Sequence, residues 1–164
     1  RYVDVSTAQE LRDAAVAEFG ACDVLLLAAA VVDFRPSLAA DRKLKKSEGQ
    51  EHMRVDLELT PDILSELAAA KRGDQTVVGF AAEHGEGALD YGRDKLRRKG
   101  LDAIVVNDIS RKDIGFDVPY NEVTIVTATD ETPVPRASKR EVARAILDTV
   151  AGLRAATDRA GAPS

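Results

Sequence analysis

The sequence is poor in the residues that build disulfide frameworks and metal sites. Its 164 residues include one cysteine, Cys22, and two histidines, His52 and His84. A single cysteine excludes an internal disulfide and a CxxC metal site, and two histidines exclude a metal site built on three or more of them. One lone thiol fits a reducing compartment, so we expect a cytoplasmic protein.

Long apolar runs and an excess of basic charge are also missing. No apolar run approaches the ~20 residues that a membrane-spanning helix needs. Lysine and arginine total 23 against 28 aspartate and glutamate residues, which gives a net charge of −5. Because phosphate contacts require a basic face, an acidic chain is a poor general nucleic-acid binder, although one local anion pocket is compatible with it. The 45% hydrophobic and 31% charged residues are typical of a soluble globular domain.

Apolar segments of strand length alternate with segments of helical periodicity. The predicted strands cover residues 2–5, 23–30, 53–59, 76–82, 103–106 and 121–128, and the predicted helices cover residues 8–19, 61–71, 88–99 and 138–153. Because this alternation produces βαβ units, the predicted fold is α/β, a Rossmann-like three-layer sandwich with a mostly parallel sheet. We expect one domain over residues 1–154, followed by a frayed tail at 155–164.

Helix-end signals support this division. Either Ser6 or Thr7 is placed to cap a helix, and Glu10 stands as in a capping box, which predicts a helix start. Thr60 followed by Pro61 predicts a second start, with threonine at the N-cap and proline at the first helical position. Gly100 is placed to end the third helix.

Polar and small residues follow the predicted strands, where an open α/β sheet binds its ligands. Ala29 and Ala30 end one strand, and small side chains there allow either a close ligand or tight helix packing. Asp33 comes just after them and is either a ligand for Mg²⁺ or a ribose hydroxyl, or a turn acid. The lysines of a predicted loop, Lys43 among them, either close over a polyphosphate or keep the loop soluble.

The predicted helix 88–99 carries a run of cations from Arg93 to Lys99. Lys95 and Lys99 are four residues apart and share a helix face, so they can engage one phosphate chain. The same run is also compatible with a helix end whose cations complement the helix dipole, or with a non-catalytic anion- or RNA-binding module. The net acidic charge disfavours RNA.

A second alternative is an NAD(P)-binding oxidoreductase module. Gly85 and Gly87 follow a predicted strand and open a helix, and Asp108 lies about 20 residues further on, as in a dinucleotide-binding fingerprint. The match is weak because Asp90 occupies the third glycine position.

Seven segments carry recognisable motifs in a fixed order, namely 3–11, 28–36, 43–46, 59–64, 77–83, 94–102 and 105–108. The most specific combination is AAAVVDFRP followed by KLKK. In this order the segments resemble the phosphopantothenate–cysteine ligase family, which in bacteria is usually the C-terminal half of a two-part coenzyme A biosynthesis protein. The resemblance implies an enzyme that joins 4′-phosphopantothenate and L-cysteine. CTP activates the carboxylate as an acyl-cytidylate and releases pyrophosphate, and cysteine then displaces CMP.

The resemblance also implies roles for individual residues. Lys43 matches a lysine that engages the phosphates during acyl transfer, and Asp33 matches an acid that contacts CTP through the ribose or a Mg²⁺ ion. Phe80 is placed at the cytosine. The remaining residues expected to contact the nucleotide are Ala29, Ala30, Pro61, Asp62, Ile63, Lys95 and Lys99.

The resemblance has consequences for assembly. It implies a homodimer that pairs through later strands, here residues 116–136, and a flavin-dependent decarboxylase half in the full-length chain. The family's glycine-rich phosphate loop and an asparagine-bearing segment have no match, and the sequence starts at Arg1 rather than Met. We therefore expect a fragment of a longer protein that binds CTP but has little ligase activity alone. Neither a nucleic acid nor a membrane is an expected partner.

Overall fold

The computed structural model describes residues 1–38, 42–45, 51–83, 85, 87–110, 113–114 and 118–161. Lys46, His84 and Phe116, which the sequence analysis singled out, lie outside the described residues. The elements are α1 (Ala8–Phe19), β1 (Val24–Leu27), β2 (Phe34–Pro36), β3 (Leu57–Leu59), α2 (Ile63–Ala70), β4 (Thr76–Glu83), α3 (Ala88–Lys99), β5 (Ala103–Asp108), β6 (Tyr120–Thr127), β7 (Glu131–Ser138) and α4 (Lys139–Gly161).

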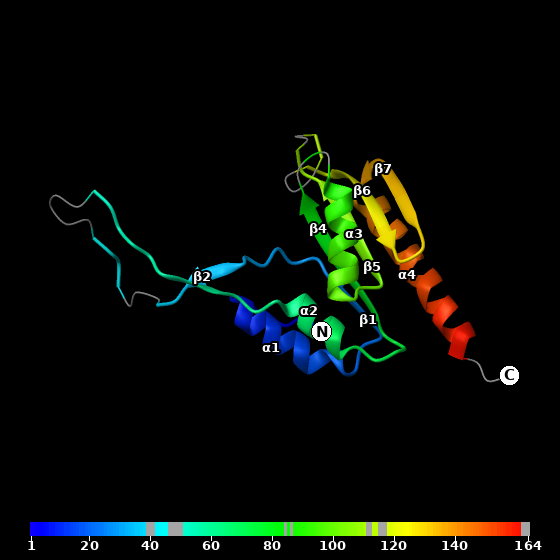
Figure 1. The fold of residues 1–164 in the computed structure, drawn as a ribbon, viewed down its shortest axis with the longest axis horizontal. Coiled ribbons are helices and arrows are strands. Elements are labelled where there is room, and N and C mark those ends of the chain that lie inside the picture. The colour runs from blue at the N-terminus through cyan, green and yellow to red at the C-terminus, as the bar shows by residue number, and fades with distance from the viewer. Residues whose placement is uncertain are drawn as a thin grey trace.

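The main sheet has the strand order β1-β4-β5-β6-β7 (Figure 1). β1 pairs with β4 and β4 with β5 in parallel, whereas β6 is antiparallel to both of its neighbours. Four of the five strands therefore run in one direction, and the predicted α/β fold with a mostly parallel sheet is confirmed.

Helices cover both faces of this sheet, which gives three layers. One face packs against α1, α2 and α3 through a core that includes Leu67 and Ile104, and the other packs against α4 through a core that includes Val105 and Ile146. Successive residues of β5 alternate between these cores, as side chains on a strand covered on both sides must. Among the described residues, no helix combines the length and apolar character needed to cross a bilayer.

The helix ends predicted at Thr7 and Gly100 agree with the structure. Thr7 is the N-cap of α1, and its capping box with Glu10 is complete. Gly100 ends α3 with a φ of 64°, a left-handed conformation that glycine adopts without strain. α4 continues to Gly161, so residues 155–161 are helical where the sequence predicted a frayed tail.

The predicted strand at residues 2–5 is wrong. The segment alternates apolar and polar residues, but no strand of the described residues pairs with it, and Tyr2 is fully exposed. A strand is stabilised by hydrogen bonds to another strand, and alternation within the segment does not supply them.

Residues 34–59 contain a two-stranded arm that projects away from the main sheet (Figure 1). β2 pairs antiparallel with β3, and Arg35 and Glu58 form an ion pair across them at 2.8 Å. The predicted strand 53–59 is therefore strand only at its last three residues. Cross-strand partners share a face, so Phe34 and Leu59 lie together and leave an exposed apolar face on the arm.

Candidate functional site

The carboxyl ends of β1 and β4 open into a cleft beside α2 and α3, which we call the α2 cleft. Its volume is about 480 Å³. It contains all of the predicted nucleotide-binding residues except Ala30 and Lys43, namely Ala29, Asp33, Pro61, Asp62, Ile63, Phe80, Lys95 and Lys99. The fold thus brings together residues that are up to 70 positions apart in the sequence.

The rim of the α2 cleft is built by the segment after β1 and the turn before α2. The Thr60 amide donates to the Asp33 carbonyl oxygen at 2.9 Å, and the Thr60 hydroxyl donates to the Val32 carbonyl oxygen. The sequence predicted Thr60 as the N-cap of α2, and this is wrong, because the helix begins at Ile63 rather than at Pro61. Asp62 takes that position, and its carboxylate accepts the Ser65 amide at 3.1 Å.

Lys99 reaches across the cleft from the end of α3. Its Nζ lies 2.8 and 2.7 Å from the two carboxylate oxygens of Asp62, and its side chain is only 14% exposed. Partial burial opposes ionisation of Asp62, but the hydrogen bonds from Lys99 and Ser65 outweigh burial and lower the pKa of the carboxyl. An ammonium and a helix N-terminus therefore meet at one point of the cleft.

Lys95 lies one turn before Lys99 on the same face of α3. Its Nζ donates to the Phe80 carbonyl oxygen at 3.4 Å and lies 6.0 Å from the centre of the Tyr91 ring. Burial, and next the charge of Lys99, lower the pKa of Lys95. Burial has removed part of the water that would hydrate this ammonium, so a bound anion would stabilise its charged form.

A second cleft of about 350 Å³, the α4 cleft, lies between the same strand ends and α4. Ala30 lines this cleft, and Ala29, Phe80 and Lys95 line both clefts. Asn107 also lines it, and the Asn107 Oδ1 atom is buried with no hydrogen-bond partner among the described residues. Buried acceptors are rarely left unpaired, so this oxygen is suited to a donor group on a ligand.

Asn107 was missed as a site residue by the sequence analysis. The matching segment 105–108 contains it, at the end of an apolar run where a ligand-facing side chain is expected. Its unpaired oxygen is a property of three-dimensional packing and has no sequence signal.

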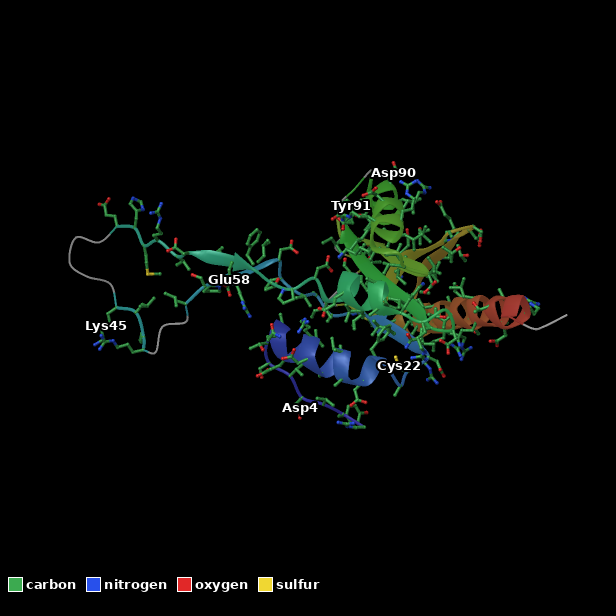
Figure 2. The ribbon with its side chains drawn as sticks, turned by 60° about the horizontal axis from the view of Figure 1, so that its bottom comes forward. Asp4, Cys22, Lys45, Glu58, Asp90 and Tyr91 are labelled. Atoms are coloured by element: carbon green, nitrogen blue, oxygen red, sulfur yellow. The ribbon has the colours of Figure 1, made fainter. Side chains whose placement is uncertain are left out.

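Lys43 is not part of either cleft lining. It is exposed and belongs to the arm. Figure 2 shows Lys45, two residues further on, far out on this arm and away from α3. The structure therefore separates the lysines of the arm from the lysines of α3.

The residues that suggested an NAD(P)-binding module or an RNA-binding module contact other groups of the protein. The Gly85 amide donates to the Asp108 carboxylate at 3.1 Å, and Asp108 and Glu122 both line the adjoining hollow, so two carboxylates stand where a pyrophosphate would bind. The cationic run of α3 is also divided, because Arg93 pairs with Glu131 while Lys95 and Lys99 line the α2 cleft.

Donors for a resident metal ion are few. Within the described ranges, no three histidine, cysteine, aspartate or glutamate side chains lie close enough to hold a metal ion together. Asp33 lines the α2 cleft, and its exposed side chain is able to contribute one carboxylate. Mg²⁺ is commonly held by one or two carboxylates together with substrate phosphates, and Asp33 fits that arrangement.

Comparison with known proteins identifies the family. The model of the DNA/pantothenate metabolism flavoprotein C-terminal domain, DFP, matches residues 1–153. The chain belongs to the DFP family. This agrees with the resemblance carried by the AAAVVDFRP and KLKK segments.

DFP relatives extend beyond the length of this chain. The coenzyme A biosynthesis bifunctional protein CoaBC of Bacillus subtilis is 38% identical over 153 residues, which are 93% of this chain and 37% of that protein. A cysteine/cysteine sulfinic acid decarboxylase of an unknown prokaryote is 40% identical over 124 residues, which are 76% of this chain and 34% of that protein. The chain thus spans about a third of the length of these curated relatives.

Solved structures share the DFP fold. The C-terminal domain of CoaBC superimposes with a TM-score of 0.70 at 32% identity and covers 90% of this chain and 63% of its own. A Cab2 mutant in complex with phosphopantothenate-cysteine has a TM-score of 0.64 at 18% identity, with 96% of this chain and 52% of its own covered. This second likeness concerns the fold alone.

Proposed function

We propose that this chain is the nucleotide-binding domain of a CTP-dependent ligase that joins 4′-phosphopantothenate to L-cysteine in coenzyme A biosynthesis. The observation that carries the proposal is the α2 cleft, which gathers the residues that the family resemblance assigns to CTP. The names of the CoaBC relatives support the pathway. Activation through an acyl-cytidylate, with release of pyrophosphate and then CMP, is the proposed chemistry.

The α2 cleft supplies two kinds of phosphate contact. The N-terminal end of α2 faces the cleft, and the helix dipole favours an anion there, although the Ile63 amide itself donates to the Pro61 carbonyl oxygen at 3.0 Å. Lys95 and Lys99 add two ammonium groups on the facing helix. When a substrate carboxylate attacks the α-phosphate, negative charge develops on the transferred group and on the departing pyrophosphate, and these donors stabilise it.

Asp33 and Lys43 complete the proposed phosphate chemistry. Asp33 would hold Mg²⁺ or a ribose hydroxyl of CTP, and the metal would neutralise part of the triphosphate charge. Lys43 would add a cation during acyl transfer. Since Lys43 lies outside the cleft linings, this role requires the arm to approach a bound nucleotide.

The α4 cleft suits the base of the nucleotide. Phe80 lies between the two clefts, and the unpaired Asn107 Oδ1 offers an acceptor. Cytosine presents an exocyclic amine at the position where uracil presents an oxygen, so an acceptor in this cleft favours cytosine over uracil.

The assembly of the full-length protein is part of the proposal. A flavin-dependent decarboxylase half and a homodimer are expected from the resemblance, and the chain alone is expected to have little ligase activity. The proposed dimer segment includes β7, whose Pro133 and Pro135 lack amide donors, so side chains rather than edge hydrogen bonds would carry pairing there. Sedimentation of the chain should give twice its 17.6 kDa mass.

Calorimetric titration tests the nucleotide assignment. We expect CTP with Mg²⁺ to bind more tightly than ATP, UTP or NADH, and Lys95→Ala and Phe80→Ala to weaken the binding. Arg97→Ala is the matched control, because Arg97 lies on the same helix, is 76% exposed and lines neither cleft. Equal affinity for all four nucleotides, or tighter NADH binding, would contradict the proposal.

A further inference from the structure

The Lys99–Asp62 ion pair occupies the point of the α2 cleft that best suits an anion. Lys99 is held by both oxygens of Asp62, and Ser65 donates to the same carboxylate through its amide at 3.1 Å and its hydroxyl at 2.7 Å. The carboxylate therefore both caps α2 and neutralises the ammonium. The Lys99 ammonium and the Ser65 amide, the two donors that would bind an incoming phosphate, are thus already paired with Asp62.

The charges lining the α2 cleft also balance. Among the described residues, the charged side chains of the lining are those of Lys95, Lys99, Asp33 and Asp62, whose formal charges sum to zero. A site that binds a highly charged phosphate chain is expected to be cationic. Removing the Asp62 charge would make this sum positive and would leave Lys99 without its carboxylate partner.

We propose that Asp62 is a charge lock on the nucleotide site: it holds Lys99 and the start of α2, and a phosphate group binds by taking Lys99 from it. Asp62 thereby lowers the affinity of the cleft for anions, and Lys99 changes partner from carboxylate to phosphate on binding. The lock deepens the function proposed above and rests on it. Asp62 is a positioning residue, because it acts through Lys99.

The Asp62→Asn variant separates the lock from the helix cap. Asparagine is as good an N-cap as aspartate, since its side-chain oxygen still accepts the Ser65 amide, so the fold should be kept. We expect the variant to bind inorganic pyrophosphate, without a metal, about fivefold more tightly than the parent chain, the scale of one exposed ion pair. This affinity should also fall more steeply with ionic strength, a response that the loss of a cap alone does not produce.

Two further variants test whether the gain passes through Lys99. Asp90→Asn adds the same unit of charge on α3 at a side chain that is 82% exposed, outside the α2 cleft lining, and should leave the affinity unchanged. The double variant Asp62→Asn/Lys99→Met should lose the gain. If Asp62→Asn tightens pyrophosphate binding as much in the Lys99→Met background as in the parent chain, the effect is simple repulsion and the lock is refuted.

Other results would also overturn the lock. Weaker pyrophosphate binding by Asp62→Asn would show that Asp62 only aims Lys99, and no binding by either protein would show that the unlocked cleft is no anion site. Failure of the proposed function is distinguishable, because it would appear as a lack of preference for CTP among nucleotides while the pyrophosphate results still follow the lock.

Discussion

Gly92 lies on the face of α3 that packs against β5, and a methyl group at this position has no room. A Cβ on Gly92 would overlap the Cγ2 atom of Val106, which is 5% exposed and belongs to a central strand. Val106 is β-branched and has few alternative rotamers. We therefore expect Gly92→Ala to push α3 away from the sheet.

The size of the effect follows from two opposed terms. Alanine is about 1 kcal/mol more favourable than glycine inside a helix, whereas overpacking a core costs about 1–3 kcal/mol. Because Val106 cannot move outward, the overpacking cost lies in the upper part of that range, at about 2–3 kcal/mol. Subtracting the helix gain leaves an expected fall of about 1–2 kcal/mol in the free energy of unfolding. For a chain of this length that corresponds to a Tm lower by about 2–8 °C.

Urea titration and thermal unfolding measure this loss, and Gly152→Ala is the matched control. Gly152 is a helical glycine of α4 with open space around it, so alanine there should stabilise the protein by about 1 kcal/mol. Adding Val106→Ala to Gly92→Ala should cost less than the sum of the single changes. If Gly92→Ala is as stable as Gly152→Ala, the argument from close packing is refuted.

The remaining predictions concern the site and two hydrogen bonds. Burial, and next the charge of Lys99, lower the pKa of Lys95, so its ammonium loses its proton at a lower pH than an ordinary lysine does. CTP affinity should therefore begin to fall at that lower pH. In calorimetry, the CTP affinity of Lys95→Met should depend less on pH than that of the parent chain. Gln75→Leu should lower the free energy of unfolding by about 1–3 kcal/mol in urea, because the buried amide donates to the Phe19 and Cys22 carbonyl oxygens at 2.7 and 2.8 Å. Thr7→Ala should lower it by about 1 kcal/mol and Thr7→Ser should not, because only alanine removes the capping hydroxyl. An unchanged urea midpoint for Gln75→Leu or for Thr7→Ala would contradict the contribution assigned to the hydrogen bond that the variant removes.

Local signals in the sequence predicted the local parts of the structure. The capping box of Thr7 and Glu10 and the terminating Gly100 depend on residues a few positions apart, and both are present. The apolar runs that became β4 and β5 are buried on both faces, so their composition alone identifies them as strands. The edge of the sheet where the clefts lie also follows from the order of strands and helices.

Features that depend on distant residues were not predictable. Residues 2–5 alternate as a strand does, but within the part of the chain that the structure describes no strand lies beside them to pair with. The Thr60 hydroxyl donates to the Val32 carbonyl oxygen, 28 residues earlier, and no local signal predicts that contact. Asp62 and Lys99 are 37 residues apart, and neither residue type identifies the other as its partner.

The α2 cleft and the α4 cleft share a wall, and this wall couples binding in one cleft to binding in the other. Ala29, Phe80 and Lys95 line both the α2 cleft and the α4 cleft, so a ligand that moves the Lys95 ammonium in one cleft alters the other. Thermodynamic linkage makes such an effect reciprocal: each ligand changes the affinity of the other by the same factor. In the proposed function the phosphates and the base of one nucleotide would lie on either side of this wall, so each part would change the binding of the other by the same factor.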